Sequence, residues 1–154
     1  MTLNEILTRQ NVLNAILLKD GDNELGKELK VKMVRLRMAF NKYKKSLDEE
    51  VQEFTKELVP EELKTLQEKP ESERTEEENT RLKELVDKVN SEYNEFMIQK
   101  GNEEVKFDTN YSFTDDDFDS IVAVNAGNEV EINGNKVKSE DLIEAFYELF
   151  VNKN

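Results

Sequence analysis

The amino-acid sequence predicts a mainly α-helical protein: a long antiparallel helical hairpin with a leading helix and a small C-terminal α+β cap containing a β-hairpin. Three observations carry this prediction. Apolar residues recur at helical spacing through most of the first hundred positions. The 154 residues are 36% hydrophobic and 37% charged, which suits elongated helices that share a thin core. Near the C-terminus, an Asn-Gly pair separates two short alternating segments, as in a hairpin.

The leading helix is predicted over residues 3–19. Thr2 and Glu5 have the spacing of a capping box, in which each side chain accepts a backbone N–H of the other residue. Asp20-Gly21 is expected to end the helix, because glycine tolerates the left-handed conformation that follows many helix ends. One face carries the apolar residues Leu3, Ile6, Leu7, Leu13, Ile16 and Leu17.

A second, much longer helix is predicted from Leu25 to Leu58. Its apolar residues recur in nine steps that cover 33 residues, a mean spacing of 3.67, which keeps them on one face of a nearly straight helix. Gly26 is a poor helix former and favours a start one turn later. Pro60 is expected to end or kink this helix, and it can also open a short helix that follows.

A third helix is predicted to return along the second. The charged segment 69–79 has no apolar residue and is expected to form an exposed turn. Thr75 and Glu78 then provide another capping box, and Gly101 is expected to close the helix. Two long helices joined by a short polar turn form an αα-hairpin in which each buries its apolar face against the other. We therefore expect residues 1–101 to form a helical hairpin domain.

Residues 102–154 are expected to form a small acidic α+β cap. Residues 105–107 alternate like a strand, and Thr114 is expected to cap a helix that stops at Gly127. Asn133-Gly134 favours a two-residue type I′ turn between residues 130–132 and 135–137.

The cap should end in a helix and be attached to the hairpin through aromatic residues. Ser139 is expected to be the N-cap of this terminal helix. An isolated β-hairpin is only marginally stable, so it must pack on a helix. Tyr111 and Phe113, which lie between the third helix and the cap, are the candidates for joining the cap to the hairpin.

Charge is distributed unevenly along the chain. Residues 1–58 carry a net charge of +1, residues 59–100 of −5 and residues 101–154 of −9, which together give the −13 of the whole chain. Between Lys27 and Lys45 there are eight cations and a single anion, Glu28. None of the eight occupies the predicted apolar face, so all are expected to face solvent. This basic band consists of Lys27, Lys30, Lys32, Arg35, Arg37, Lys42, Lys44 and Lys45.

Three interpretations of the basic band remain open. The acidic cap or the glutamate-rich third helix of the same chain could neutralise it. Alternatively, it could contact acidic residues of another copy or of a partner protein. Nucleic-acid phosphates could also bind it, although the net charge and the lack of interleaved aromatic residues disfavour this interpretation.

No pattern in the sequence indicates catalysis, a cofactor or a metal site. The chain has no cysteine, histidine or tryptophan, which excludes thiolate nucleophiles, histidine triads and Cys/His zinc sites. Asp115, Asp116, Asp117 and Asp119 form the most acidic cluster of the cap. A calcium loop that began at Asp115 would place Ser120 and Ala126 where glycine and glutamate are required. Carboxylates in a first helical turn are also expected from the helix dipole, so this acidic cluster is interpreted as an interaction surface.

The layout resembles small structural and assembly proteins of tailed bacteriophages. The residues that carry the resemblance are LTRQNVLNAILL (7–18), VRLRMAFNKYKKSLDEEVQEF (34–54), EYNEF (92–96) and EVEINGNKVKSEDLIEAFYELF (129–150). The resemblance implies a virion component or an assembly factor, and it supplies no functional residues.

Taken together, these features lead us to expect a non-enzymatic structural or assembly protein that acts through protein–protein contacts. Its partners would be protein subunits of a larger assembly, among which further copies of the chain are one candidate. No membrane is expected, and nucleic acid is disfavoured as a partner. The opening residues lack the features of a signal peptide, so a virion or host-cytoplasm location is expected. The alternative is an acidic inhibitor that mimics nucleic acid and blocks a host defence or DNA-binding protein.

Overall fold

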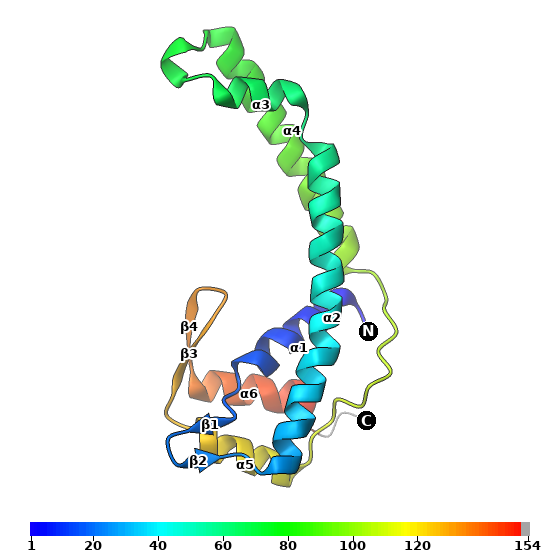
Figure 1. Ribbon diagram of the computed structural model, residues 1–154, viewed down its shortest axis with the longest axis vertical. Coiled ribbons are helices and arrows are strands. Elements are labelled where there is room, and N and C mark those ends of the chain that lie inside the picture. The colour runs from blue at the N-terminus through cyan, green and yellow to red at the C-terminus, as the bar shows by residue number, and fades with distance from the viewer. Residues whose placement is uncertain (152–154) are drawn as a thin grey trace. The chain divides into compact units, whose positions relative to one another are not determined.

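The computed structural model describes residues 1–151 (Figure 1), and these residues are mainly helical. The chain divides into two compact units. The first contains Met1–Lys44 together with the described part of the chain from Glu104 onward, and the second contains Lys45–Glu103. Helix α2 (Lys27–Leu58) contributes its first half to one unit and its second half to the other.

The first unit begins with α1 (Leu3–Ala15), which is shorter than predicted. The capping box of Thr2 and Glu5 is present as predicted, but Ile16 is already extended. The chain then forms a two-stranded turn, β1 (Lys19–Asp20) and β2 (Asn23–Glu24), around Gly21, whose φ is +58°. The apolar pattern continues past Ala15 because Ile16 is buried and Leu17 is half-buried, although neither is helical.

The core of the first unit joins α1 and the first half of α2 to the C-terminal elements. Phe40, Phe146 and Phe150 are fully buried there, and Phe113 packs against both Phe146 and Phe150, with ring centroids 5.1 and 6.0 Å away. α1 lies against α6 (Ser139–Phe150) and β3 (Glu129–Ile132). Burying aromatic rings removes the most apolar area per side chain from water, which lets a thin core hold these segments together.

The C-terminal helix and hairpin follow the prediction, with one exception. α5 (Asp115–Asn125) has the expected Thr114 cap, and β3 pairs antiparallel with β4 (Asn135–Lys138). Asn133 and Gly134 have φ of 51° and 79°, as a type I′ turn requires. The expectation that Ser139 is the N-cap of α6 is wrong. Lys138 has that position, and the buried Ser139 hydroxyl accepts the N–H of Gly127 at 3.0 Å.

Residues 105–107 do not form the predicted strand. The backbone of Val105 donates a single hydrogen bond to Met1 O at 2.9 Å, and Thr2 and Glu104 form an isolated bridge. Phe107 is half-buried against Phe40, with ring centroids 4.4 Å apart. The alternation therefore reflects two inward side chains, Val105 and Phe107, on an extended segment whose backbone has no partner strand.

The second unit contains the helical hairpin. Phe54 of α2 stacks on Phe96 of α4 (Glu76–Gly101) at 4.1 Å between ring centroids, and Glu50 pairs with Lys100. Pro60 precedes α3 (Glu61–Glu68), whose Leu63 and Leu66 are buried with Leu85 of α4. The short helix η1 (Glu71–Glu73) lies within the predicted charged turn, and the capping box that begins α4 is present.

The compact units differ from the expected division into 1–101 and 102–154. Leu29, Met33, Leu36 and Phe40 share a core with α5 and α6, so the first half of α2 packs with the C-terminal elements. Tyr111 and Phe113 belong to that same core, where Tyr111 contacts Phe107 and Phe150, and they do not join two separate domains. The apolar period of α2 is continuous, so it could not reveal that the packing partner changes along the helix.

Candidate interaction surfaces

Three cations of the basic band have partners within the first unit. The ammonium of Lys30 pairs with Glu24 of β2. Lys32 contacts Ser112 O and Asp117. Arg37 binds two backbone carbonyls at the end of α1. The expectation that all eight cations face solvent is therefore wrong for four of them, which are half-buried: Lys30, Lys32, Arg37 and Lys44. Their position beside the apolar face of α2 brings the long side chains over the edge of the core.

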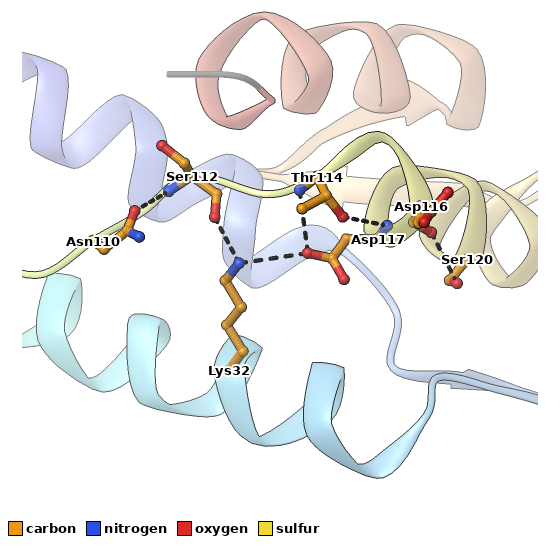
Figure 2. A network of polar contacts seen from close by, with 7 residues as sticks. All are labelled: Lys32, Asn110, Ser112, Thr114, Asp116, Asp117 and Ser120. Atoms are coloured by element: carbon orange, nitrogen blue, oxygen red, sulfur yellow. Dashed lines mark hydrogen bonds and ion pairs between the residues drawn. The ribbon is translucent and has the colours of Figure 1, made fainter. Parts of the chain in front are cut away.

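Lys32 connects α2 to the start of α5 (Figure 2). Its ammonium donates to Ser112 O at 2.6 Å and lies 3.5 Å from Asp117 Oδ2. Asp117 Oδ2 also accepts the N–H of Thr114 at 3.2 Å within the capping box. The same ammonium lies 4.2 Å from the centre of the Phe113 ring, a cation–π contact. One cation of the band is thus neutralised by the acidic cluster of its own chain.

Arg37 binds the C-terminal end of α1. Its guanidinium donates from Nε to Leu13 O at 3.1 Å and from a terminal nitrogen to Ile16 O. These carbonyls have no partner further along α1, and a cation at a helix C-terminus also interacts favourably with the helix dipole. Burial lowers the pKa of Arg37 below its ordinary value, and an arginine side chain still stays charged at neutral pH.

The other cations of the band differ in exposure. Within residues 1–151, Lys27, Arg35 and Lys42 are exposed and have no ion pair or side-chain hydrogen bond. Lys44 is half-buried, and Lys45 is exposed and belongs to the second unit. The structure therefore divides the predicted band into cations that stabilise the fold and cations that remain available to a partner.

The available cations alternate with exposed apolar side chains on α2. Val31, Val34 and Met38 are 41%, 43% and 67% exposed. Their spacing of three and four residues places them on one side of the helix. Lys27, Arg35 and Lys42 lie within about 70° of the same direction, at 100° per residue. We call these six residues the basic face of α2: Lys27, Val31, Val34, Arg35, Met38 and Lys42.

A groove of about 560 Å³ adjoins the basic face. Val31, Lys32 and Arg35 of α2 line one side, and Thr109 and Asn110 of the extended segment line the other. Sequence analysis singled out the cations and missed the apolar residues between them. The signal was present, because Val31, Val34 and Met38 fall at helical spacing outside the main apolar face of α2.

A second surface lies between α5 and α6, in the first unit. Phe118 and Tyr147 are in edge-to-face contact at 5.0 Å, and Tyr147 is 46% exposed. Beside them a groove of about 420 Å³ is lined by Val122, Ile143, Glu140 and Glu144, among others. We call the surface formed by these six residues and Asp119, which follows Phe118, the acidic groove.

The acidic groove has no basic residue on either of its helices. α5 carries Asp115, Asp116, Asp117 and Asp119, and α6 carries Glu140, Asp141, Glu144 and Glu148, with no lysine or arginine on either. Asp115, Asp116 and Asp119 are exposed, whereas Asp117 is half-buried and bound by Lys32. The predicted acidic cluster thus extends over two helices, and the contribution of α6 was not expected from the sequence.

The described part of the chain contains neither a metal-binding cluster nor a membrane-spanning helix. Within residues 1–151, no three carboxylates are grouped closely enough to hold a metal ion. No helix in this part of the chain combines the length and apolar character needed to cross a membrane. No protein-family model, curated protein or solved structure matches the chain.

Proposed function

We propose that this protein is a non-enzymatic structural or assembly protein, a component of a bacteriophage virion, that acts through protein–protein contacts. It would be found in the virion or in the host cytoplasm. The basic face of α2 carries the proposal, because it exposes apolar and cationic side chains together. A helix face with apolar anchors at spacings of three and four residues is a common way of docking one protein on another.

The charges of the basic face favour a protein partner with acidic residues. Lys27, Arg35 and Lys42 are unpaired within residues 1–151, so a partner does not have to break existing ion pairs to contact them. Nucleic acid is a poorer candidate, because the eight carboxylates of α5 and α6 belong to the same compact unit and repel phosphates.

Co-sedimentation with phage particles tests the proposal. The double variant Arg35→Glu/Lys42→Glu should no longer be found in the particle fraction of a density gradient, because both cations are exposed and would contact the acidic partner. Lys83→Glu/Lys88→Glu is the matched control, because it makes the same change in charge on α4 and should co-sediment like wild type. Arg37 is unsuitable for this test, because its replacement would also weaken α1. If both double variants still co-sediment with the particles, the proposal is contradicted.

The second candidate is an acidic inhibitor that mimics nucleic acid. The specific observation in its favour is the row of eight carboxylates on α5 and α6, without a single cation. Such a protein should compete with DNA for a basic host protein. Its activity should be lost on reversing Asp115 and Asp119 and be unaffected by Arg35→Glu/Lys42→Glu. The two candidates therefore respond to opposite sets of variants.

A further inference from the structure

We propose that the basic face of α2 in one copy binds the acidic groove between α5 and α6 of a second copy, so that copies associate head to tail. The inference rests on the proposed function, and it identifies a partner for the surface that carries that proposal. The proposed occupant of the groove is therefore α2 of another molecule of this chain.

Charge complementarity between the two surfaces is the first argument. Three unpaired cations project from the basic face, whereas α5 and α6 carry eight carboxylates and no cation. Complementary potentials select partners and orient them during encounter. Two copies of the basic face, or two acidic grooves, would repel each other. A contact between unlike surfaces is therefore favoured over a contact between two like surfaces.

The distribution of exposed apolar side chains is the second argument. Five large apolar residues are conspicuously exposed within residues 1–151, and three of them are Val31, Val34 and Met38 of the basic face. A fourth is Tyr147, which lies at the acidic groove, and Ile98 of the second unit is the fifth. Both sides of the proposed contact therefore expose apolar side chains. Cations border them on the basic face, and carboxylates border them at the acidic groove.

The shapes of the two surfaces are compatible. The basic face is the exposed side of a single helix, which we call the ridge, and the acidic groove is a hollow of about 420 Å³ between two helices. Met38 is the most exposed apolar residue of the ridge, and its flexible, polarizable side chain adapts readily to an irregular apolar hollow. Lys42 and Arg35 would then face Glu140 and Glu144 or Asp119 at the rim.

A single copy cannot satisfy both surfaces by itself. Both belong to the first compact unit, and the exposures of Met38 and Tyr147 show that neither surface is covered within that unit. Because the two surfaces are different, the contact is heterologous, and each copy keeps one surface available for a further copy. A contact through one helix is small by the standards of stable dimers, so we expect association at micromolar to millimolar concentrations.

Sedimentation velocity on the purified full chain tests this inference. Wild-type protein should increase at least about two-fold in average mass between roughly 1 μM and 500 μM, as expected of a weak interface. Ridge variant Arg35→Glu/Lys42→Glu and groove variant Asp119→Lys/Glu144→Lys should each remain monomeric. Asp119 and Glu144 are chosen because they lie beyond the first turns of their helices, where reversal would oppose the helix dipole.

Mixing the two variants gives the decisive result. The ridge variant retains an intact groove and the groove variant an intact ridge, so an equimolar mixture should associate although each variant alone does not. Lys83→Glu/Lys88→Glu and Asp87→Lys/Glu95→Lys are matched controls on α4, and both should associate like wild type. Circular dichroism of each variant checks that the helices remain formed.

Several results would overturn the inference. Wild type that stays monomeric throughout the concentration range would exclude it, as would association that persists in either double variant. A mixture of the two variants that contains only monomers would exclude the pairing of these particular surfaces. If wild type is monomeric but still co-sediments with particles through Arg35 and Lys42, the partner is a different acidic protein, and the proposed function survives without this inference.

Discussion

Arg35 and Arg37 lie two residues apart on α2 and have different surroundings. Arg35 is exposed, and it has no ion pair or side-chain hydrogen bond within residues 1–151, whereas Arg37 donates to the carbonyls of Leu13 and Ile16. Hydrogen bonds from a charged donor to buried acceptors contribute about 1.5–3 kcal/mol. The structure therefore assigns a stabilising role to one arginine and leaves the other available to a partner.

Replacing these two arginines by methionine separates the roles. Arg37→Met should lower the free energy of unfolding by about 1.5–3 kcal/mol, because two carbonyls at the end of α1 lose their donor. Arg35→Met should change it by less than about 0.5 kcal/mol, as surface substitutions usually do. Urea denaturation followed by circular dichroism measures both, and equal effects would contradict the assignment.

Asn125 offers a second residue-scale prediction. The residue is 1% exposed. Its side-chain oxygen accepts a hydrogen bond from Leu17 N at 2.7 Å, and its side-chain nitrogen donates to Leu17 O and Ile121 O at 3.1 and 2.8 Å. Asn125→Ala should lower the free energy of unfolding by about 1–3 kcal/mol, because the backbone N–H and C=O of Leu17 each lose a hydrogen bond in a buried setting. Asn125→Asp should cost more, since a carboxylate would face two carbonyl oxygens.

Urea denaturation under identical conditions measures both variants. Asn11→Ala serves as the control, at a half-buried asparagine of α1 that has no side-chain hydrogen bond within residues 1–151. A more stable Asn125→Asp than Asn125→Ala would show that the amide group does not act as the donor. The sequence did not single out this asparagine, and it predicted Arg37 as a solvent-facing cation of the basic band. The partners of both side chains are backbone groups of segments remote along the chain. Such contacts leave no periodic or compositional signal.

At the scale of elements, two ion pairs stabilise the hairpin of the second unit. Arg81 of α4 binds Glu62 of α3 through two hydrogen bonds of 2.8 and 3.0 Å, which hold the pKa of Glu62 below its ordinary value of 4.5. Lys69, with additional help from the Thr75 backbone N–H, lowers the pKa of Glu78 in the same way. Both carboxylates are therefore more acidic in the folded protein than in the unfolded chain.

These lowered pKa values predict the response to acid. Above the ordinary value of 4.5, the two carboxylates contribute their full stabilisation, and the contribution is lost as the pH falls through their folded pKa values. The variant Glu62→Gln/Glu78→Gln should therefore lose less stability than wild type between pH 6 and pH 3. Thermal unfolding at several pH values measures this.

The matched control is Glu95→Gln/Glu57→Gln, at two exposed glutamates that have no ion pair within residues 1–151. The control should retain the acid sensitivity of wild type. If both double variants follow the same pH dependence, the ion pairs of Glu62 and Glu78 contribute nothing specific to the folded state.

The sequence predicted elements well wherever the signal was local. The three capping boxes at Thr2, Thr75 and Thr114 and the Asn-Gly turn are all present, because each involves residues at most four apart. The strand at 105–107 and the capping role of Ser139 are wrong for the opposite reason. A strand requires a partner elsewhere in the chain, and the Ser139 hydroxyl binds Gly127, twelve residues away.

On the scale of the whole molecule, the response to salt distinguishes assembly from folding. Raising the ionic strength from about 0.05 to 0.5 M shortens the Debye length to roughly a third, which screens exposed charges. Self-association through the basic face and the acidic groove should weaken accordingly. The unfolding midpoint should change little, because the core of the first unit is apolar. Sedimentation and thermal denaturation on the same samples test this, and association that strengthens with salt would contradict an electrostatic contact.

The domain organisation was the part of the fold least accessible to sequence analysis. The period of α2 predicted its length and its buried face correctly, from Lys27 to Leu58. It could not indicate that Phe40 packs with Phe150 while Phe54 packs with Phe96, because both phenylalanines continue the same pattern. Only the charges of the basic face were predicted, because the sequence alone does not show which valines of α2 remain exposed.

Placing the ridge and the groove on different helices gives any row of copies a direction. One terminal molecule would present an unoccupied α2 and the other an unoccupied pair of helices, so growth and arrest at the two ends would be separate events. A foreign subunit that reproduced only the carboxylate-lined hollow would stop extension at one end and leave the other open. The length of such a row would then depend on how abundant that terminator is.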